Sequence, residues 1–199
     1  MEPPPAGLTP VPGRRRRQHL TTRPTQDLDL FTRAGRGTVP AARNAFENAA
    51  ASRGWSVRRI RNSDTFCRLV VTGDDDLLVD LALDSPPNLP PETSIAGPTF
   101  ALEELAGRKL LALFDRAEAR DFADVYDIAQ RYDIGLLLER AAQIDPGFDP
   151  SILAAMLGSL SRFDDSDIPV PTESVANLRR YFHNWQQQLL VESAGDNQA

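Results

Sequence analysis

The first half of the chain alternates polar and apolar residues in a pattern that predicts β-strands. TQDLDLFT, at residues 25–32, alternates aspartate with leucine, as a strand with one buried face does. Three further segments with strand composition lie at residues 55–61, 65–73 and 77–84, separated by the turn sequences Asn-Ser-Asp and Gly-Asp-Asp-Asp. Between the first strand and these three, residues 39–54 predict a helix, because Pro40 stands near its first turn and Gly54 at its end.

The second half of the chain has helical periodicity instead. Residues 85–98 contain five prolines and predict a loop. After Phe100, apolar residues recur every three or four positions, which predicts helices at residues 101–116, 119–133, 134–144, 150–160 and 172–190. The order of strand, helix, strands and then helices is typical of an α+β protein. We therefore expect a small mixed sheet with helices at residues 23–99, a helical domain at 100–199 and a disordered Pro/Arg-rich arm at 1–22.

Three aspartates in the predicted strands are candidate metal ligands. Asp27 and Asp29 are two positions apart in one strand, so their side chains point to the same face. Asp80 lies in an apolar strand, where a charged side chain is unusual unless it is paired or binds a metal. Mg²⁺ prefers such oxygen ligands and usually shares its shell with substrate phosphates. The three carboxylates could hold two ions over a triphosphate and support an in-line displacement; a solvated strand face is the alternative.

Composition narrows the class of protein. The chain has 199 residues, of which 41% are hydrophobic, and this suits one domain or a small core with a helical annex. The net charge of −6 argues against a protein that coats nucleic acid non-specifically, although a local basic patch could still grip one RNA end. No apolar run is long enough to cross a bilayer. The single cysteine, Cys67, indicates a reducing compartment and a buried small side chain.

The segment RPTQDLDLF, from Arg23 to Phe31, resembles the R-x-T-x-D-[LI]-D-[LF] signature of AbiEii/MenT-type nucleotidyltransferase toxins. In that family an apolar–Asp–apolar strand follows, and Val79-Asp80-Leu81 matches it. A helix with a lysine comes next, matched by Lys109, and then an R-x(3)-R-D-x-x-D segment, matched by residues 116–124. The resemblance implies a polymerase β-like nucleotidyltransferase core followed by a C-terminal helical half.

The resemblance also implies roles for single residues. Asp27 and Asp29 would bind Mg²⁺, and Asp80 would complete the metal site and help to deprotonate the attacking hydroxyl. Lys109 would contact the phosphates of the NTP substrate and take part in catalysis. The other expected site residues are the catalytic Asp121 and the nucleotide-binding Thr25, Arg120 and Asp124. The alternative for Lys109 is a surface lysine whose stem packs along the protein while its ammonium stays in water. For Thr25 it is a turn cap, and for the remaining helical residues it is a solvated helix with ordinary ion pairs, namely Arg116, Arg120, Asp121 and Asp124.

One part of the family pattern is missing from this sequence. The family has a Gly-Gly or Gly-Ser turn upstream of its Asp-x-Asp pair, where backbone amides approach the triphosphate. Here the same region reads VPGRRRRQHLTTRPTQDLD, with a single Gly13 followed by arginine. The true start could lie upstream, the chain could be an inactive remnant, or the arginines could cradle phosphate by charge. We favour the first as a hypothesis, with the consequence that this N-terminally short form could lack activity.

Two further clusters have more than one reading. Arg58, Arg59 and Arg61 lie on or beside a predicted strand and could bind an RNA backbone, or they could be the charges that blunt an edge strand. Tyr181, Phe182 and Trp185 predict helix packing in preference to a base-stacking platform.

The resemblance implies a bacterial, cytoplasmic toxin that transfers NMP from an NTP to the 3′ end of tRNA and so blocks aminoacylation and growth. Its cofactor would be Mg²⁺, and its partners would be the tRNA acceptor stem and a cognate antitoxin, with no membrane. Transfer to a small molecule or a protein hydroxyl is one alternative. An inactive truncated family member, or a decoy that binds the antitoxin, is the other.

Overall fold

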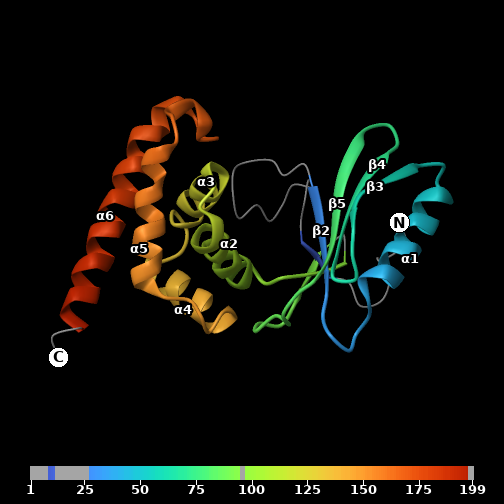
Figure 1. Ribbon diagram of the computed structural model, residues 1–199, viewed down its shortest axis with the longest axis horizontal. Helices are drawn as coiled ribbons and strands as arrows, with labels where there is room; N and C mark the ends of the chain where they lie inside the picture. The colour runs from blue at the N-terminus through green and yellow to red at the C-terminus, as the bar shows by residue number, and fades with distance from the viewer. Residues whose placement is uncertain (1–8, 12–26, 95–96, 197–199) are drawn as a thin grey trace. The chain divides into compact units, whose positions relative to one another are not determined.

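A computed structural model of the protein describes residues 9–11, 27–94 and 97–196. These residues fall into two compact units, divided between Ala101 and Leu102, close to the predicted boundary. The first contains a β-sheet and is here called the sheet unit; the second contains only helices and is called the helical unit (Figure 1). The mixed α+β class expected from the order of elements is confirmed.

The sheet unit is built on a five-stranded mixed sheet. Its strands are β1 (Thr9–Val11), β2 (Asp27–Thr32), β3 (Ser56–Asn62), β4 (Phe66–Thr72) and β5 (Asp76–Leu83). Their order across the sheet is β1-β2-β5-β4-β3. The two strands β2 and β5 are parallel neighbours, and every other neighbouring pair is antiparallel. The aspartates expected to bind metal therefore lie on the two strands that pair in parallel.

One face of this sheet is covered by helix α1 (Val39–Ala51), as Figure 1 shows. The helix begins at Thr38, whose side chain accepts a hydrogen bond from the Ala41 amide. It ends before Gly54, whose φ of +75° suits a residue without Cβ. The core between helix and sheet is apolar, with Leu30, Cys67, Leu69, Val71, Val79 and Leu81 among its buried residues. The prediction that Cys67 is a buried small side chain is confirmed, and burial raises the pKa of its thiol.

The structure has strands at two places where the sequence predicts none. Thr9–Val11, inside the arm expected to be disordered, pair with β2 as β1, while residues 1–8 and 12–22 of that arm lie outside the described residues. The proline-rich segment expected to be a loop contains the short hairpin of β6 (Glu92–Ser94) and β7 (Gly97–Thr99). These strands are only three residues long, too short for an alternating pattern, and they form through backbone pairing, β1 with β2 and β6 with β7.

The helical unit contains the helices that the periodicity predicts. They are α2 (Leu102–Arg116), α3 (Ala119–Ile128), α4 (Ile134–Ile144), α5 (Pro150–Gly158) and α6 (Thr172–Asp196), with the 3₁₀ turns η1 (Ser159–Arg162) and η2 (Asp165–Asp167). Helices α5 and α6 pack side by side, and α2 packs against α3 and α4. Phe182 and Trp185 are almost completely buried and stack with ring centroids 6.1 Å apart. The predicted packing role of the Tyr181–Trp185 cluster is confirmed.

None of the helices in the described part of the chain has the length and apolar character needed to span a bilayer.

Candidate active site

Asp27, Asp29 and Asp80 lie together on the sheet face opposite α1. Asp29 and Asp80 occupy the same register position of the parallel strands β2 and β5, and Asp27 is two residues earlier on β2. The residues next to them along each strand, such as Leu30 and Val79, are buried on the α1 side, so alternation places the aspartates on the other side. We call this side the carboxylate face. The sheet thus brings together the three carboxylates that the sequence predicts to share a site.

This arrangement is electrostatically unfavourable unless a cation is present. Neighbouring strands lie about 4.8 Å apart, and like charges directly opposite each other destabilise a sheet. Asp29 and Asp80 are such a pair. The Asp80 side chain is only 13% exposed, so water screens its charge poorly. A positive group must therefore balance the carboxylate face.

Arg68 supplies a positive charge next to Asp80. It lies opposite Asp80 on the antiparallel strand β4. Its Nε donates to Oδ1 of Asp80 at 2.8 Å and its Nη2 to Oδ2 at 2.6 Å. The pKa of Arg68 is raised above its usual value, chiefly by these hydrogen bonds and further by the negative charges of Asp80, Asp29 and Asp27. Asp29 and Asp27 are therefore close enough to act on the same guanidinium.

Sequence analysis overlooked Arg68, although its signal was present. The residue stands between the apolar Cys67 and Leu69, just as Asp80 stands between Val79 and Leu81. The predicted turn after residue 72 makes the two segments a hairpin, and a hairpin turn sets which residues face each other. Opposite charges at facing positions of two apolar strands would have identified the pair.

The carboxylate face fits a divalent cation in the kind and placement of its ligands. Three carboxylates on one face of two parallel strands supply the oxygens that Mg²⁺ prefers. Among the described residues, however, no three His, Cys, Asp or Glu side chains converge closely enough to form a metal site as they stand. Both oxygens of Asp80 are engaged by Arg68. Binding of an ion by all three aspartates would require Asp80 to turn from Arg68 or to share its oxygens.

Lys109 and Asp124 form an ion pair within the helical unit. Lys109 lies on α2 and Asp124 on α3, and the Lys109 Nζ donates to Oδ2 of Asp124 at 2.8 Å. Asp124 is 2% exposed, whereas the lysine side chain is 30% exposed. The buried carboxylate anchors a lysine whose chain still reaches the surface of the unit. This geometry suits a positioned point charge. The burial of Asp124 differs from the ion pair on a solvated helix that was the alternative for this residue.

Asp121 and Arg116 form a second pair between the same two helices. The Arg116 Nε and Nη2 donate to the two oxygens of Asp121 at 2.9 and 2.8 Å. Asp121 also accepts from the Glu118 amide at 3.1 Å and so completes a capping box at the start of α3. At 2% exposure, its carboxylate is fully used by these contacts. The hydrogen bonds to Asp121 are also the main cause of a raised pKa at Arg116.

Of the two other expected nucleotide-binding residues, the structure describes only Arg120. Arg120 makes a surface ion pair with Glu118, with Nε 2.9 Å from Oε2 and both side chains about half exposed. Such exposed pairs contribute little stability, so Arg120 is available to a ligand. Thr25 lies outside the described residues.

The arginines of β3 divide between the two faces of the sheet. Arg59 points toward α1 and makes a two-pronged ion pair with Glu47, both bonds being 2.7 Å. A register shift between Arg59 and Arg61 places Arg61 opposite Arg68, with its guanidinium 5.3 Å from the ring centre of Phe66. Arg58, opposite Val70, shares that side. Only two of the three predicted RNA-binding arginines therefore lie on the carboxylate face, at the sheet edge.

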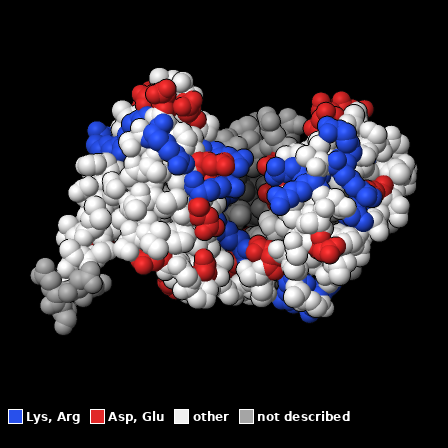
Figure 2. Space-filling model, in the orientation of Figure 1, with Lys and Arg blue, Asp and Glu red and all other residues white. Residues whose placement is uncertain are grey.

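Charged groups also gather on the surface. Figure 2 shows Lys and Arg side chains over the part of the molecule that contains the sheet and also over the helical part, in spite of the net charge of −6.

Comparisons with known proteins place the chain in a family. The model of the nucleotidyl transferase AbiEii toxin family, from type IV toxin–antitoxin systems, matches residues 15–169. No curated protein matches the sequence. The solved structure of MenT4, a nucleotidyltransferase toxin from Mycobacterium tuberculosis, is similar with a TM-score of 0.54 and 19% identity, over 82% of this chain and 68% of that one. JHP933 from Helicobacter pylori has a TM-score of 0.46 and 20% identity, over 88% of this chain and 82% of its own.

Proposed function

The chain belongs to the AbiEii family of nucleotidyltransferase toxins, and from this premise we propose that it transfers NMP from an NTP to the 3′ end of tRNA. Such a transfer would block aminoacylation and growth. The observation that carries the proposal is the facing pair Asp29 and Asp80 on parallel strands, with Asp27 beside them. Two like charges that face each other across neighbouring strands give the sheet no structural advantage. Departures from the rules that stabilise a fold are expected at functional sites.

The transfer is a single displacement at phosphorus. The 3′ oxygen of the acceptor forms a bond to the α-phosphorus of the NTP, the bond to the β-phosphate breaks, and pyrophosphate leaves. Asp80 accepts the proton of the attacking hydroxyl; its side chain is 13% exposed, and it lies between Asp29 and Arg68 on the neighbouring strands. Arg68, released from Asp80 in this step, stays next to the charge that develops on phosphate oxygens.

Asp27, Asp29 and Asp80 would hold Mg²⁺. Bound there, the ion supplies charge stabilisation for the attacking and leaving oxygens of the displacement. Asp27 and Asp29 hold their place through β2, whose neighbours on both sides fix its backbone. Rigid strands of this kind position ligands more accurately than loops do.

The helical unit contributes the residues that we propose to contact the nucleotide. Lys109 binds the phosphates as a point charge, and Asp124 orients it through the 2.8 Å ion pair. Arg120 is placed on the exposed side of α3 and can add a second phosphate contact. Asp121 acts as a positioning residue, because its oxygens are engaged by Arg116 and by the backbone at the start of α3.

The proposed partners follow from the family and the reaction. A type IV toxin–antitoxin system implies a cognate antitoxin. The reaction needs NTP and tRNA, which places it in the bacterial cytoplasm. Arg58 and Arg61, on the carboxylate face, are the candidates for contact with the RNA backbone.

The test is a labelling assay with the full chain. Purified protein is incubated with total tRNA, Mg²⁺ and each NTP labelled at the α-phosphate in turn, beside Asp29→Asn and Asp80→Asn. Asp74→Asn, in the hairpin turn before β5, is the matched control, since it also removes one carboxylate. We expect label on tRNA from the parent chain and from Asp74→Asn, and a loss of at least about 100-fold in the other two variants.

Two results would count against the proposal. Label on tRNA that persists in Asp29→Asn would show that the carboxylates are not needed for the transfer. Label on an aminoglycoside or a protein hydroxyl, with none on tRNA, would retain the transferase and replace its acceptor.

A further inference from the structure

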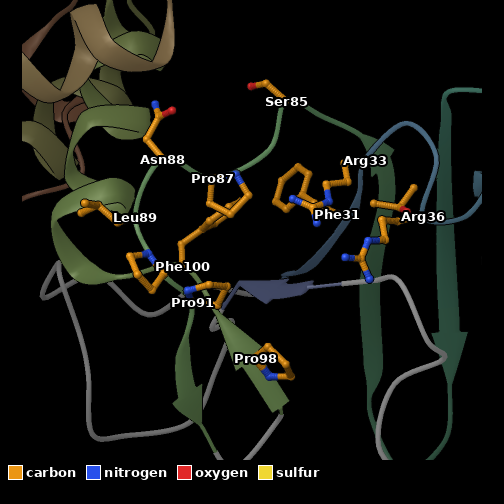
Figure 3. A pocket seen from close by; sticks show the side chains of 12 residues that line it. Phe31, Arg33, Arg36, Ser85, Pro87, Asn88, Leu89, Pro91, Pro98 and Phe100 are labelled. Carbon is orange, nitrogen blue, oxygen red and sulfur yellow. The ribbon is translucent and has the colours of Figure 1, made fainter.

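A pocket opens at the end of β2, within the sheet unit. It has a volume of about 450 Å³. Figure 3 shows Phe31 between Pro87 on one side and Arg33 and Arg36 on the other. The remaining wall is formed by the proline-rich segment before α2 and includes Asn88, Pro91, Pro98 and Phe100. The pocket therefore combines flat apolar surfaces with cationic groups on one side.

Phe31 is the natural platform of this pocket. Its ring packs against that of Phe100, with centroids 5.7 Å apart and planes at 44°. Phe100 is 3% exposed, whereas Phe31 is half-buried, so one ring supports the other and part of the second is left accessible. Aromatic rings held in this way stack with nucleobases, whichever base is present.

The pocket adjoins the carboxylates along the strand. Asp27, Asp29 and Phe31 occupy alternate positions of β2 and so share the carboxylate face. Residues two apart on a strand are separated by about 6.6 Å. A base stacked on Phe31 would thus keep the sugar attached to it within reach of Asp29. Ligands of open sheets commonly bind outside the carboxyl ends of parallel strands, where this pocket lies.

The arginines indicate which nucleotide the pocket holds. Arg33 and Arg36 come after the end of β2, and so lie beyond Phe31 on the side away from the carboxylates. The phosphates of an NTP would be at the carboxylates, but the phosphodiester of an RNA end lies on the opposite side of its sugar from the 3′ hydroxyl. Cations on the far side of the base platform therefore match an RNA end.

The space also continues past the arginines. A second depression of about 870 Å³ shares Arg33, Arg36 and Ser85 with the pocket and extends along Gly35 and Pro86. Asp84 also lines it and would repel phosphate, but its Oδ1 accepts from the Ser85 amide at 2.7 Å. A single nucleotide would not need this extension, whereas a strand of RNA would.

We propose that this pocket binds the 3′-terminal nucleotide of the RNA acceptor, with its base on Phe31 and its phosphodiester at Arg33 and Arg36. The inference rests on the proposed function, because it places the 3′ hydroxyl next to Asp29 and Asp80. It adds to that function a site for the acceptor within the sheet unit.

Binding of a short RNA with the sequence of a tRNA 3′ end, labelled at its 5′ end, tests the proposal without any transfer. Fluorescence anisotropy with the full chain measures the Kd for this RNA and for the same RNA with an abasic 3′-terminal nucleotide. We expect Phe31→Ala to weaken binding of the intact RNA about 5- to 100-fold, and Phe31→Trp to retain it. With the abasic RNA, Phe31→Ala and the parent chain should bind equally.

The arginines are tested by the salt dependence of the same binding. The variant Arg33→Ala with Arg36→Ala should reduce the slope of log K against log salt by about 1, since phosphate contacts release counterions. Arg180→Ala, an exposed arginine of α6, is the matched control and should leave the slope unchanged. Binding of an NTP, measured by equilibrium dialysis, should be the same in Phe31→Ala as in the parent chain.

The outcomes separate this inference from the proposed function. Weaker NTP binding with unchanged RNA binding in Phe31→Ala would assign the pocket to the NTP base and overturn the inference. An RNA Kd that changes neither in Phe31→Ala nor with the abasic RNA would also overturn the inference, even where tRNA is labelled as proposed. If no RNA is labelled by the parent chain but binding still depends on Phe31 and the terminal base, the inference stands and the transfer fails.

Discussion

The guanidinium of Arg68 holds both carboxylate oxygens of Asp80, through bonds of 2.8 and 2.6 Å between facing residues of β4 and β5. Asp29 faces Asp80 from the other side, on β2. The central carboxylate therefore lies between a cation and an anion on neighbouring strands. Without a bound ion, Arg68 offsets part of the negative charge of the carboxylate face, and an ion bound by Asp80 would compete with it.

We expect Arg68→Ala to make the stability of the chain depend on Mg²⁺. Removing the guanidinium leaves the largely buried Asp80 next to Asp29 without its hydrogen-bonding partner, which costs about 1–3 kcal/mol of unfolding free energy. An added cation should restore part of that loss. Urea unfolding in EDTA measures the loss of unfolding free energy, and urea unfolding in Mg²⁺ measures how much of it the cation restores. Arg58→Ala, exposed on the same face, should change stability by less than about 0.5 kcal/mol. An equal loss with and without Mg²⁺ would show that the carboxylates do not bind the ion.

Lys109→Met should affect both stability and transfer, and the two effects can be separated. The change leaves Asp124, which is 2% exposed, without the ammonium at 2.8 Å, at a cost of about 1–3 kcal/mol. The double variant Lys109→Met with Asp124→Asn should recover part of the stability, because the buried charge is gone. It should not recover nucleotidyl transfer, measured as kcat/KM for the NTP. Recovery of transfer together with stability would make the lysine a purely structural partner.

Tyr181→Phe should stabilise the helical unit and flatten its response to alkaline pH. The Tyr181 hydroxyl is buried and has no hydrogen-bond partner among the described residues. Its removal should raise the unfolding free energy by up to about 1 kcal/mol.

Burial, with smaller contributions from Asp133 and Tyr126, raises the pKa of Tyr181 to about 12. A pKa raised above the unfolded value of about 10 favours the folded state below pH 10, and this contribution is lost as the pH rises toward 12. Chemical unfolding between pH 9 and 12 measures the slope of the unfolding free energy against pH. A slope that is identical in Tyr181→Phe would contradict the assignment.

Gly107→Ala should destabilise the helical unit although alanine favours helices. A Cβ at this position would lie 2.8 Å from the Cβ of Arg140 and 3.0 Å from its carbonyl carbon, where α2 meets α4. Backbone atoms cannot move aside cheaply, so we expect a loss of about 1–3 kcal/mol. Gly195→Ala, in α6 with nothing near the added methyl, is the control and should gain up to about 1 kcal/mol. Thermal melts of the two variants should therefore shift in opposite directions.

Much of the fold could be predicted because its elements carry local patterns. The strand at residues 27–32 alternates aspartate with leucine, and the helix at 39–54 has Pro40 near its first turn and Gly54 at its end, so each carries its signal within a single segment. The burial of Cys67 follows from the apolar segment around it, and that of Trp185 from the aromatic helix face that it shares with Tyr181 and Phe182. The strand β1 and the hairpin of β6 and β7 had no such pattern, because each has three residues and exists through its pairing with other strands.

The candidate site also has features that local sequence patterns predict and features that only strand pairing sets. Asp27 and Asp29 share a face because alternation along one strand requires it, and Asp80 is conspicuous because its neighbours are apolar. Nothing along the chain states that β2 lies beside β5 in a register that sets Asp29 against Asp80. Likewise, the sequence does not show which faces of the sheet Arg58, Arg59 and Arg61 occupy. One register shift in β3 turns Arg59 to α1 and Arg61 to the carboxylate face.

By itself, the sequence determined the longer strands and helices and which acidic residues are out of place in them, since these depend on neighbours a few positions away. The tertiary structure alone decided that Arg68 neutralises Asp80, that Lys109 pairs with Asp124, and that a pocket opens beyond Phe31. Those relationships join residues that only strand pairing and helix packing bring together, and no periodicity along the chain encodes them.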